Sequence, residues 1–217
     1  MGDVEAAASL ILSSRYVIAL TGAGTSVESG IPPFRGPGGI WTKFGEPSMN
    51  GYRRFLRDPK GSWEGWLKPE RSRELGVSIR EAEPNPAHFA LAEMEEIGIL
   101  RVLITQNIDG LHTAAGSRNV LEIHGYVGKL RCVDCGSRFP REGFDLSVLP
   151  PRCPECGGLV KGDTVMFGEP IPADVLGRCF EEAEKSDCML VVGTSAVVQP
   201  AASLPLKVKF KGGVLIE

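Results

Sequence analysis

The stretch YVIALTGAGTS, residues 16–26, contains the pattern that decides the fold of this chain. A short apolar, β-branched run ends abruptly at a glycine-rich turn, as in a buried strand that leads into a helix. Similar apolar runs follow at 101–105, 119–125, 188–193 and 213–217, and helical patterns separate them. Short strands that alternate with helices predict an α/β fold built on a doubly wound, Rossmann-like parallel sheet.

The helical patterns carry end signals. Asp3 is expected to cap a helix over residues 4–14. Asn85 and Pro86 are expected to open an amphipathic helix that Gly98 ends. Further helices are expected at 173–185 and near Ala201.

The chain of 217 residues is expected to form one large domain with a smaller appendage. Residues 32–84 interrupt the alternation with several prolines and all 3 tryptophans, and read as an insertion of loops and short helices. Residues 126–163 form a cysteine-containing module. The small domain is predicted to join this insertion to this module. The Rossmann-like part then comprises residues 1–31, 85–125 and 164–217.

Two C-x2-C pairs predict a metal site. Their cysteines are Cys132, Cys135, Cys153 and Cys156. Four thiolates are typical ligands of one structural zinc ion, and they leave no open coordination position for water. Gly136 and Gly157 follow the two pairs and can adopt the positive φ that such turns need. The alternative is a disulfide pair or scattered core cysteines, and core packing is the expectation for Cys179 and Cys188.

The composition argues against several classes of function. It is 42% hydrophobic and 24% charged, as in globular proteins, and no apolar run approaches the ~18 residues of a membrane span. A net charge of -3 gives no overall field for nucleic acid, so Lys207, Lys209 and Lys211 read as a solvated face. Residues 1–14 lack the basic start of a signal peptide. We therefore expect a cytoplasmic protein with reduced thiols that binds neither membranes nor nucleic acid.

Four polar or glycine-rich motifs follow the predicted strands. They are GAGTS at 22–26, QNID at 106–109, EIHG at 122–125 and GTS at 193–195. Ligands of doubly wound sheets bind beyond the carboxyl ends of strands, so these motifs are expected to converge on one crevice. The two glycine turns suit a dinucleotide diphosphate and its ribose. Each turn alone is equally typical of a plain strand-to-helix connection, and Val27 departs from a full GxGxxG.

Three polar side chains follow the strand at 101–105. Asn107 and Asp109 offer an amide and a carboxylate to a nicotinamide, and Gln106 is expected near a ribose. The alternative is an Asx turn that caps a helix starting near Leu111.

His124 is the candidate general base. It follows an apolar run and precedes Gly125, so its ring is expected to face the crevice as a neutral imidazole that accepts a proton near pH 7. His88 and His112 lie inside helical patterns and are expected to be structural.

Six motifs together resemble those of the sirtuin family, the NAD-dependent protein deacylases, and of its prokaryotic members in particular. Their order along the chain is GAGTSVESGIPPFRG at 22–36, TQNIDGLH at 105–112, LEIHG at 121–125, the four cysteines, VMFGEPIP at 165–172 and GTSAVVQPA at 193–201. The resemblance covers essentially the whole chain. It implies NAD as cofactor, one structural zinc ion, and an acylated protein lysine in an extended peptide as the partner.

The resemblance also implies roles for individual residues. The implied cofactor-binding residues are Gly22, Ala23, Gly24, Thr25, Ser26, Phe34, Arg35, Gln106, Asn107, Ile108, Asp109, Gly193, Thr194 and Ser195. The implied substrate-binding residues, which would pair with the peptide by strand addition, are Val165, Met166, Phe167, Gly168, Glu169 and Val197. The implied catalytic residues are His124 and Asn107.

The implied reaction transfers the acyl group from lysine to ADP-ribose and releases nicotinamide. His124 would act as general base on a ribose hydroxyl, and activity should fall as its ring is protonated. Phe34 and the insertion are the expected lid that excludes water. A mono-ADP-ribosyltransferase is the nearest alternative, because it shares the first bond-breaking step. A catalytically weak NAD-binding or zinc-ribbon interaction protein is the alternative of another class.

Three departures from the family pattern bear on these expectations. Pro33 stands where the family often has aspartate or threonine, which removes a polar contact of the cofactor loop. The Tyr-x-x-Arg pair of desuccinylating members is missing, and Trp66 and Pro69 stand at the nearest equivalent positions, although Arg71 and Arg73 lie nearby. The family's adenine-ribose loop and closing helix would follow Glu217. Their absence from the sequence predicts weakened NAD binding.

Overall fold

The computed structural model describes residues 2–68, 79 and 81–217, and its centre is a parallel sheet of five strands. Their order is β3-β2-β1-β7-β8. Every neighbouring pair is parallel, which confirms the predicted doubly wound sheet. The strand limits are Val17–Thr21 for β1, Leu100–Thr105 for β2, Val120–Glu122 for β3, Cys188–Val192 for β7 and Val214–Ile216 for β8.

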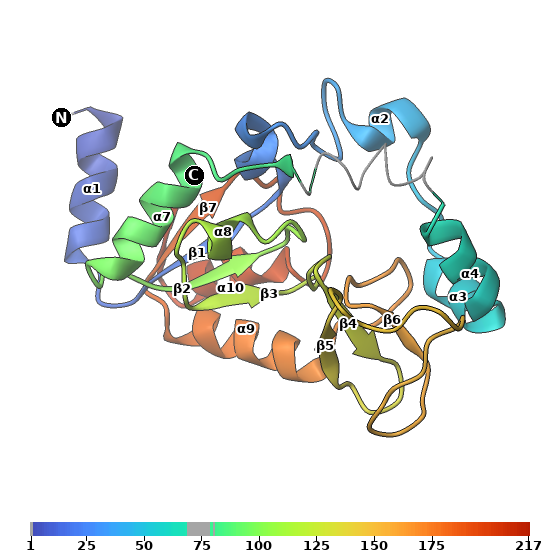
Figure 1. The fold of residues 1–217 in the computed structure, drawn as a ribbon. Coiled ribbons are helices and arrows are strands. Elements are labelled where there is room, and N and C mark those ends of the chain that lie inside the picture. Colours follow the sequence, from blue (N-terminus) through green and yellow to red (C-terminus); the bar gives the residue numbers. More distant parts are fainter. Residues whose placement is uncertain (1, 69–78, 80) are drawn as a thin grey trace.

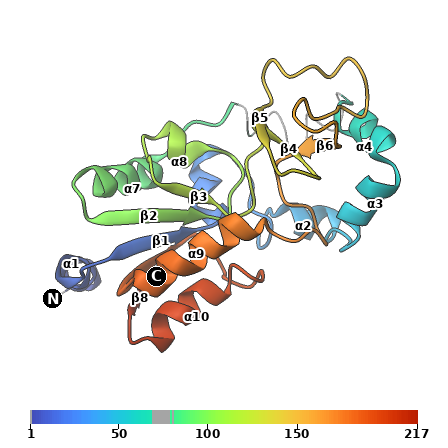
Figure 2. The ribbon, with the colours of Figure 1, turned by 90° about the horizontal axis from the view of Figure 1, so that it is seen from below.

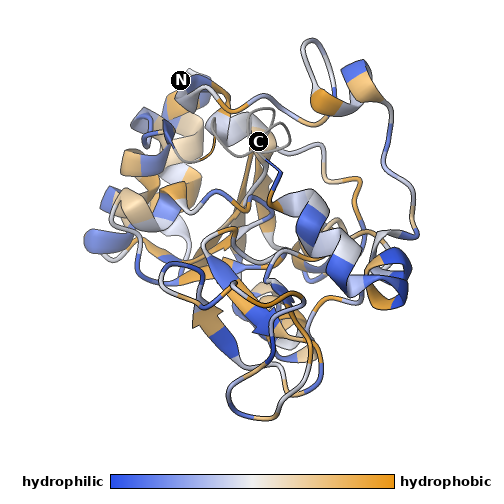
Figure 3. Cartoon of the chain, turned by 45° about the vertical axis from the view of Figure 1, so that its right-hand side comes forward, coloured by the Kyte–Doolittle hydropathy of each residue, from blue (hydrophilic) through white to orange (hydrophobic). Residues whose placement is uncertain are grey.

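Helices cover both faces of this sheet (Figure 2). The face covered by α1 (Asp3–Ser13) and α7 (Pro86–Glu96) buries Val17 and Ala19 of β1 against Leu91 of α7. The opposite face buries Ile18 and Leu20 against α9 (Ala173–Lys185) and α10 (Ser203–Phe210). Because alternate side chains of β1 enter the two layers, all five of its residues are buried. Figure 3 shows the resulting concentration of hydrophobic residues in the central strands.

A smaller antiparallel sheet lies to one side of the large one (Figure 1). It has the order β5-β4-β6, with limits Lys129–Cys132 for β4, Arg138–Pro140 for β5 and Val160–Gly162 for β6. Three short helices of the insertion accompany it: α2 (Ile40–Phe44), α3 (Gly51–Arg57) and α4 (Pro59–Trp66). Phe55 and Trp63 pack on Leu130 and Val160, and Trp63 Nε1 donates to the Val160 carbonyl at 2.9 Å. This packing supports the predicted small domain, whose boundaries stay a prediction.

The polar motifs lead into short helices. Residues Ala23–Ser29 form the 3-10 helix η1, and residues Leu111–Ala114 form α8. Asn85 caps α7 as predicted, because its side chain accepts from the backbone N–H groups of Ala87 and His88. No helix in the described part of the chain is long and apolar enough to cross a bilayer.

Several predicted limits were wrong, for local reasons. Gly2 rather than Asp3 is the N-cap of α1. Strand β3 ends at Glu122, because the Gly125 N–H donates to the Glu122 carbonyl at 2.9 Å and closes a turn. Residues 165–169, expected to pair with a peptide by strand addition, form no strand and contain a turn. In that turn Gly168 has φ +80° and the Glu169 N–H donates to the Met166 carbonyl at 2.9 Å.

Candidate functional site

The two glycine turns touch each other through their backbones. Strands β1 and β7 pair directly, so the turns at their carboxyl ends are neighbours. The Gly24 N–H donates to the Gly193 carbonyl at 2.8 Å, and the Gly22 N–H donates to the Val192 carbonyl at 3.0 Å. A Cβ on Gly24 would lie only 2.8 Å from the Gly193 Cα atom, and Gly193 itself has φ +60°. Both positions therefore require glycine.

One polar group lies beside these turns and consists of the buried Ser26 and Asn107 and the partly buried Asp109. The Ser26 hydroxyl donates to Asp109 Oδ2 at 2.8 Å and accepts from Asn107 Nδ2 at 3.0 Å. Asn107 Nδ2 also donates to the Gly22 carbonyl at 3.0 Å. Asp109 Oδ1 accepts the Leu111 N–H at 3.0 Å, so the Asx-turn alternative is realised in the same residue. The structure thus brings three predicted cofactor residues together and fixes their orientation.

Two buried histidines, His88 and His112, lie beside this polar group with their rings in contact. His88 Nδ1 accepts the Asn85 N–H at 3.2 Å, so the neutral ring carries its proton on Nε2, which lies 3.4 Å from the Ser26 hydroxyl. His112 Nε2 lies 2.9 Å from the Thr21 hydroxyl, which donates to Thr105. Both rings are structural, as predicted.

His124 is oriented by the chain that follows β2. Its Nδ1 lies 3.1 Å from the Gln106 carbonyl oxygen, which can only accept, so Nδ1 carries the ring proton and Nε2 keeps its lone pair. Burial lowers the pKa of His124, against the opposing effect of this hydrogen bond. The Gln106 side chain donates to Thr194 Oγ1 at 2.7 Å and so links His124 to the second glycine turn. The geometry yields a neutral imidazole with one free basic nitrogen.

The predicted cofactor loop contacts the predicted substrate segment through aromatic rings. The Phe34 ring lies 5.0 Å from Trp41 of α2, and Trp41 lies 5.6 Å from Phe167. Arg35 does not reach the polar group around Ser26. Its guanidinium lies over the Trp41 ring and pairs with Glu46 at 3.2 Å.

The predicted substrate residues lie on two segments. Val165 is joined to the catalytic candidate, because its N–H donates to the His124 carbonyl at 2.9 Å. Val197 is 58% exposed, and Ser195, predicted for the cofactor, is also exposed. Glu169 differs from its neighbours, because its buried carboxylate is directed at Arg131 and Lys161. No sequence signal indicated this pairing.

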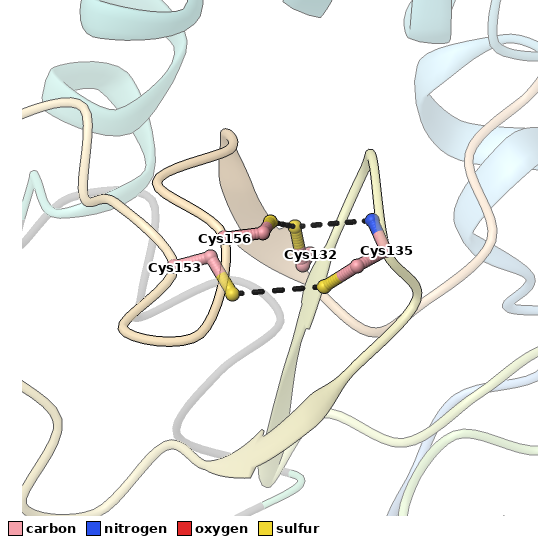
Figure 4. A group of neighbouring side chains, drawn as sticks. All are labelled: Cys132, Cys135, Cys153 and Cys156. Atoms are coloured by element: carbon pink, nitrogen blue, oxygen red, sulfur yellow. Dashed lines mark hydrogen bonds between the residues drawn. The ribbon is translucent and has the colours of Figure 1, made fainter.

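The four predicted cysteine ligands come together from two loops of the small sheet (Figure 4). Their sulfur atoms all lie within 4.8 Å of one another. Cys132 and Cys156 are 3.5 Å apart, and Cys135 and Cys153 are 3.7 Å apart. Tetrahedral ligation with Zn–S bonds of about 2.3 Å requires sulfur separations of about 3.8 Å. The cluster therefore fits one structural zinc ion.

Local backbone geometry supports the same conclusion. Gly136 and Gly157 have φ +77° and +75°, as predicted for the residue after each pair. The Cys135 N–H donates to Cys132 Sγ at 3.5 Å, and the Gly158 N–H donates to Cys156 Sγ at 3.4 Å. Such donors stabilise thiolate ligands.

Together these features define the class of protein: a Rossmann-type fold with two glycine turns and a basic imidazole beyond the carboxyl ends of its parallel strands, and a four-cysteine zinc module beside it. The chain belongs to the Sir2 family, whose model matches residues 22–200. It is 46% identical over 207 residues to "NAD-dependent protein deacylase 1" of Archaeoglobus fulgidus, covering 95% of this chain and 82% of that protein. It is 47% identical over 214 residues to "NAD-dependent protein deacetylase" of Caldivirga maquilingensis, covering 97% and 80%.

Solved structures agree with this assignment. A Sir2 homologue in complex with NAD superposes with a TM-score of 0.79 at 45% identity, covering 98% of this chain and 81% of that chain. A complex of Sir2 with a p53 peptide and NAD+ gives a TM-score of 0.79 at 36% identity, covering 99% and 85%.

Removal of the zinc site should unfold the small sheet. We expect Cys153→Ser to lose the metal and a large part of the thermal stability, since structural zinc contributes about 10 kcal/mol or more of apparent binding free energy linked to folding. Zinc content and thermal melting are the measurements. Cys179→Ala, which removes a core thiol outside the cluster, should keep one zinc ion per chain. Unchanged melting of Cys153→Ser would contradict the structural role.

The buried His112 should make the protein sensitive to acid. Burial, reinforced by His88, lowers the pKa of His112 to about 3. Between an unfolded pKa of about 6.5 and this value, only the unfolded state binds the proton, so the free energy of unfolding falls as the pH falls. The loss should be about 1.4 kcal/mol per pH unit below about pH 6.5.

Urea unfolding at several pH values measures this effect. In His112→Gln, which keeps an N–H donor for Thr21 but does not titrate, the pH dependence of unfolding should be shallower than in the wild type. Identical slopes for the two proteins would show that His112 is not the responsible group.

Proposed function

We propose that this protein is an NAD-dependent protein-lysine deacylase that removes acetyl groups and leaves free lysine. The observation that carries the proposal is the orientation of His124. The Gln106 carbonyl holds the ring in the tautomer whose Nε2 is basic, beside the crevice where the two glycine turns meet. The relatives named deacylases and deacetylases support the same activity.

NAD, when bound, supplies an electrophilic ribose carbon and the hydroxyls that receive the acyl group. We propose that Gly22 to Ser26 bind its diphosphate and adjacent ribose, and that residues 193–195 bind the adenosine half. Asn107, Ile108 and Asp109 would hold the nicotinamide side, with Gln106 at the ribose. The hydrogen bonds that Ser26 donates to Asp109 and accepts from Asn107 support this role, since they fix these two side chains before any ligand arrives.

His124 would move the proton of the acyl-transfer step. Its Nε2 accepts the proton from a ribose hydroxyl, while the Nδ1 hydrogen bond stabilises the resulting imidazolium. Asn107 is the second catalytic residue that we propose, through its position beside Ser26. Phe34 and Trp41 would exclude water from the crevice, and their ring contact supports a lid at this point.

The partner would be an acylated lysine in an extended peptide of another protein. A Sir2 structure with a p53 peptide supports a peptide of this kind. Residues 165–168 and Val197 would bind the peptide backbone. Since residues 164–170 form no strand in the structure, the pairing would be short. Reduced cysteines in a zinc cluster support a cytoplasmic location.

Acetyl is the proposed acyl group, because Trp66, at the tyrosine position of desuccinylating relatives, is partly buried against the core of the small domain. Trp66 stacks on Phe55 at 5.5 Å and meets Trp63 at 5.4 Å, in the core of the small domain. Pro69, Arg71 and Arg73 lie outside the described residues. An NAD-dependent assay that compares acetyl-, succinyl- and longer acyl-lysine peptides tests the proposal. ADP-ribose attached to protein without acyl removal would contradict it.

His124→Ala should keep the fold and NAD binding but lose about 10²-fold or more in turnover, the usual contribution of a positioned general base. In the wild type, kcat should fall as the pH is lowered through the pKa of His124. Because burial lowers that pKa, the decline should lie below about pH 6.5, the ordinary value for histidine. Near-normal turnover of the variant would exclude this role.

Asp109→Asn should weaken productive binding of NAD. The substitution keeps the size of the side chain but removes the charge that accepts from Ser26 and Leu111, so the KM for NAD should rise about tenfold while the melting temperature changes little. Asp145→Asn, at an exposed Asx turn in the loop after β5, is the matched control and should match the wild type. An unchanged KM and kcat in Asp109→Asn would count against its placement at the cofactor.

A further inference from the structure

Lys161 on β6 is a buried lysine whose three donors are all used. Its side chain is 1% exposed. The Nζ atom donates to the Gly162 carbonyl at 2.7 Å and to the Thr164 carbonyl at 2.9 Å, and it pairs with Glu169 Oε2 at 3.1 Å. One ammonium group thus binds residues at both ends of the segment 162–169, which contains most of the predicted substrate residues.

Glu169 completes this grip. Its Oε1 accepts from Arg131 Nη2 at 2.6 Å, and its Oε2 also accepts the Met166 N–H at 2.8 Å. Arg131 lies on β4 next to Cys132, and its Nε is 3.2 Å from Asp163 Oδ1. The side chains of Glu169 and Asp163 are 5% and 4% exposed. Arg131 and Lys161 therefore hold Glu169 in a nearly dry environment. Asp163 pairs with Arg131 and also accepts a hydrogen bond from Arg138 Nε of β5 at 3.1 Å.

The gripped segment lies directly against His124. The Val165 N–H donates to the His124 carbonyl at 2.9 Å, and a Cβ on Gly125 would lie 2.3 Å from the Asp163 carbonyl oxygen. On its other side the Phe167 carbonyl accepts the Tyr52 N–H of α3 at 3.0 Å. Any shift of residues 163–169 would be transmitted to the backbone of the catalytic histidine.

Stability alone does not account for this arrangement. Burial lowers the pKa of Lys161 despite its proximity to Glu169, which shows the cost of keeping the charge there. Buried ion pairs are often replaceable by apolar residues without loss of stability, whereas removal of one partner is strongly destabilising. An ionic contact at this position has a further effect that an apolar one lacks, because its hydrogen bonds fix the direction of the backbone carbonyls.

We propose that Lys161, Glu169 and Arg131 form an ionic clamp of positioning residues, which holds residues 163–168 in register with His124 for binding of the acylated peptide. The proposal rests on the proposed deacylase function and extends it to side chains that act through the backbone of residues 163–168. It also gives a route by which the zinc module acts on the peptide segment, since β4 carries Cys132 next to Arg131, and Arg131 pairs in register with Lys161 of β6.

Three variants and one control test the clamp. Lys161→Met and Glu169→Gln each leave an unmatched partner, whereas the double variant removes both charges. Lys185→Met removes an ion-paired lysine at the surface of α9, whose side chain is 52% exposed, and serves as the matched control. Each protein is examined for zinc content, for KM with acetylated peptide and with NAD, and for amide hydrogen exchange of residues 163–169.

We expect the single variants to raise the peptide KM about tenfold with the NAD KM within about twofold, the pattern of an effect confined to peptide binding. The Val165 amide should lose protection, while β1 and β2 keep theirs and zinc remains bound. The double variant should recover part of both losses, because the two sites are coupled. Lys185→Met should match the wild type. If Lys161→Met does not fold, Glu169→Gln and the double variant decide.

Wild-type peptide KM and Val165 protection in both single variants would overturn the proposal. So would uniform loss of protection together with zinc, because the residues would then be merely structural. Failure of the wild type to deacylate any peptide would refute the proposed function alone. The exchange of residues 163–169 and direct binding of the acetylated peptide would still decide on the clamp.

Discussion

The contact between the backbones of Gly24 and Gly193 is the constraint on which the crevice depends. The backbones approach this closely only because both residues lack a Cβ atom. A Cβ on either residue would lie less than 3 Å from the backbone of the other turn. The contact brings the ends of β1 and β7 together, and the end of β2 follows through the hydrogen bond from Gln106 to Thr194. His124 is in turn held by the Gln106 carbonyl, so the base is placed by a chain of contacts that starts between two glycines.

Buried polar groups determine the rest of the site. Around Ser26, a hydroxyl, an amide and a carboxylate hydrogen-bond to one another, which fixes the proposed cofactor-binding side chains. Around Lys161, the buried groups are ammonium, guanidinium and carboxylate ions, which belong to the small sheet and the segment that follows it. Each network adjoins one of the two segments that hydrogen-bond with His124. Gln106 belongs to the segment beside the Ser26 network, and Val165 belongs to the segment held by Lys161.

Sequence patterns predicted those features that depend on local chemistry. The buried strands, the caps of α7, the glycine turns and the cysteine cluster all follow from short-range periodicity and spacing. The irregular path of residues 164–170 was not predicted, because its turn at Gly168 is packed against Met49, a contact across more than a hundred residues. No sequence pattern indicated that the Lys161 side chain is buried. A lysine between valine and glycine reads as an exposed strand residue, and its burial is tolerable only because Glu169 and the carbonyls of Gly162 and Thr164 satisfy its charge and donors.

The tautomer of His124 has a consequence for how this site can change in evolution. It is imposed by a main-chain carbonyl, so no substitution of the Gln106 side chain removes the acceptor. The side chain at position 106, which donates to Thr194, can therefore change without altering the tautomer. The main chain of residue 106 thus orients His124, whereas its side chain contacts the second turn, and the two can change independently. The orientation of His124 is lost only if the peptide plane after β2 rotates.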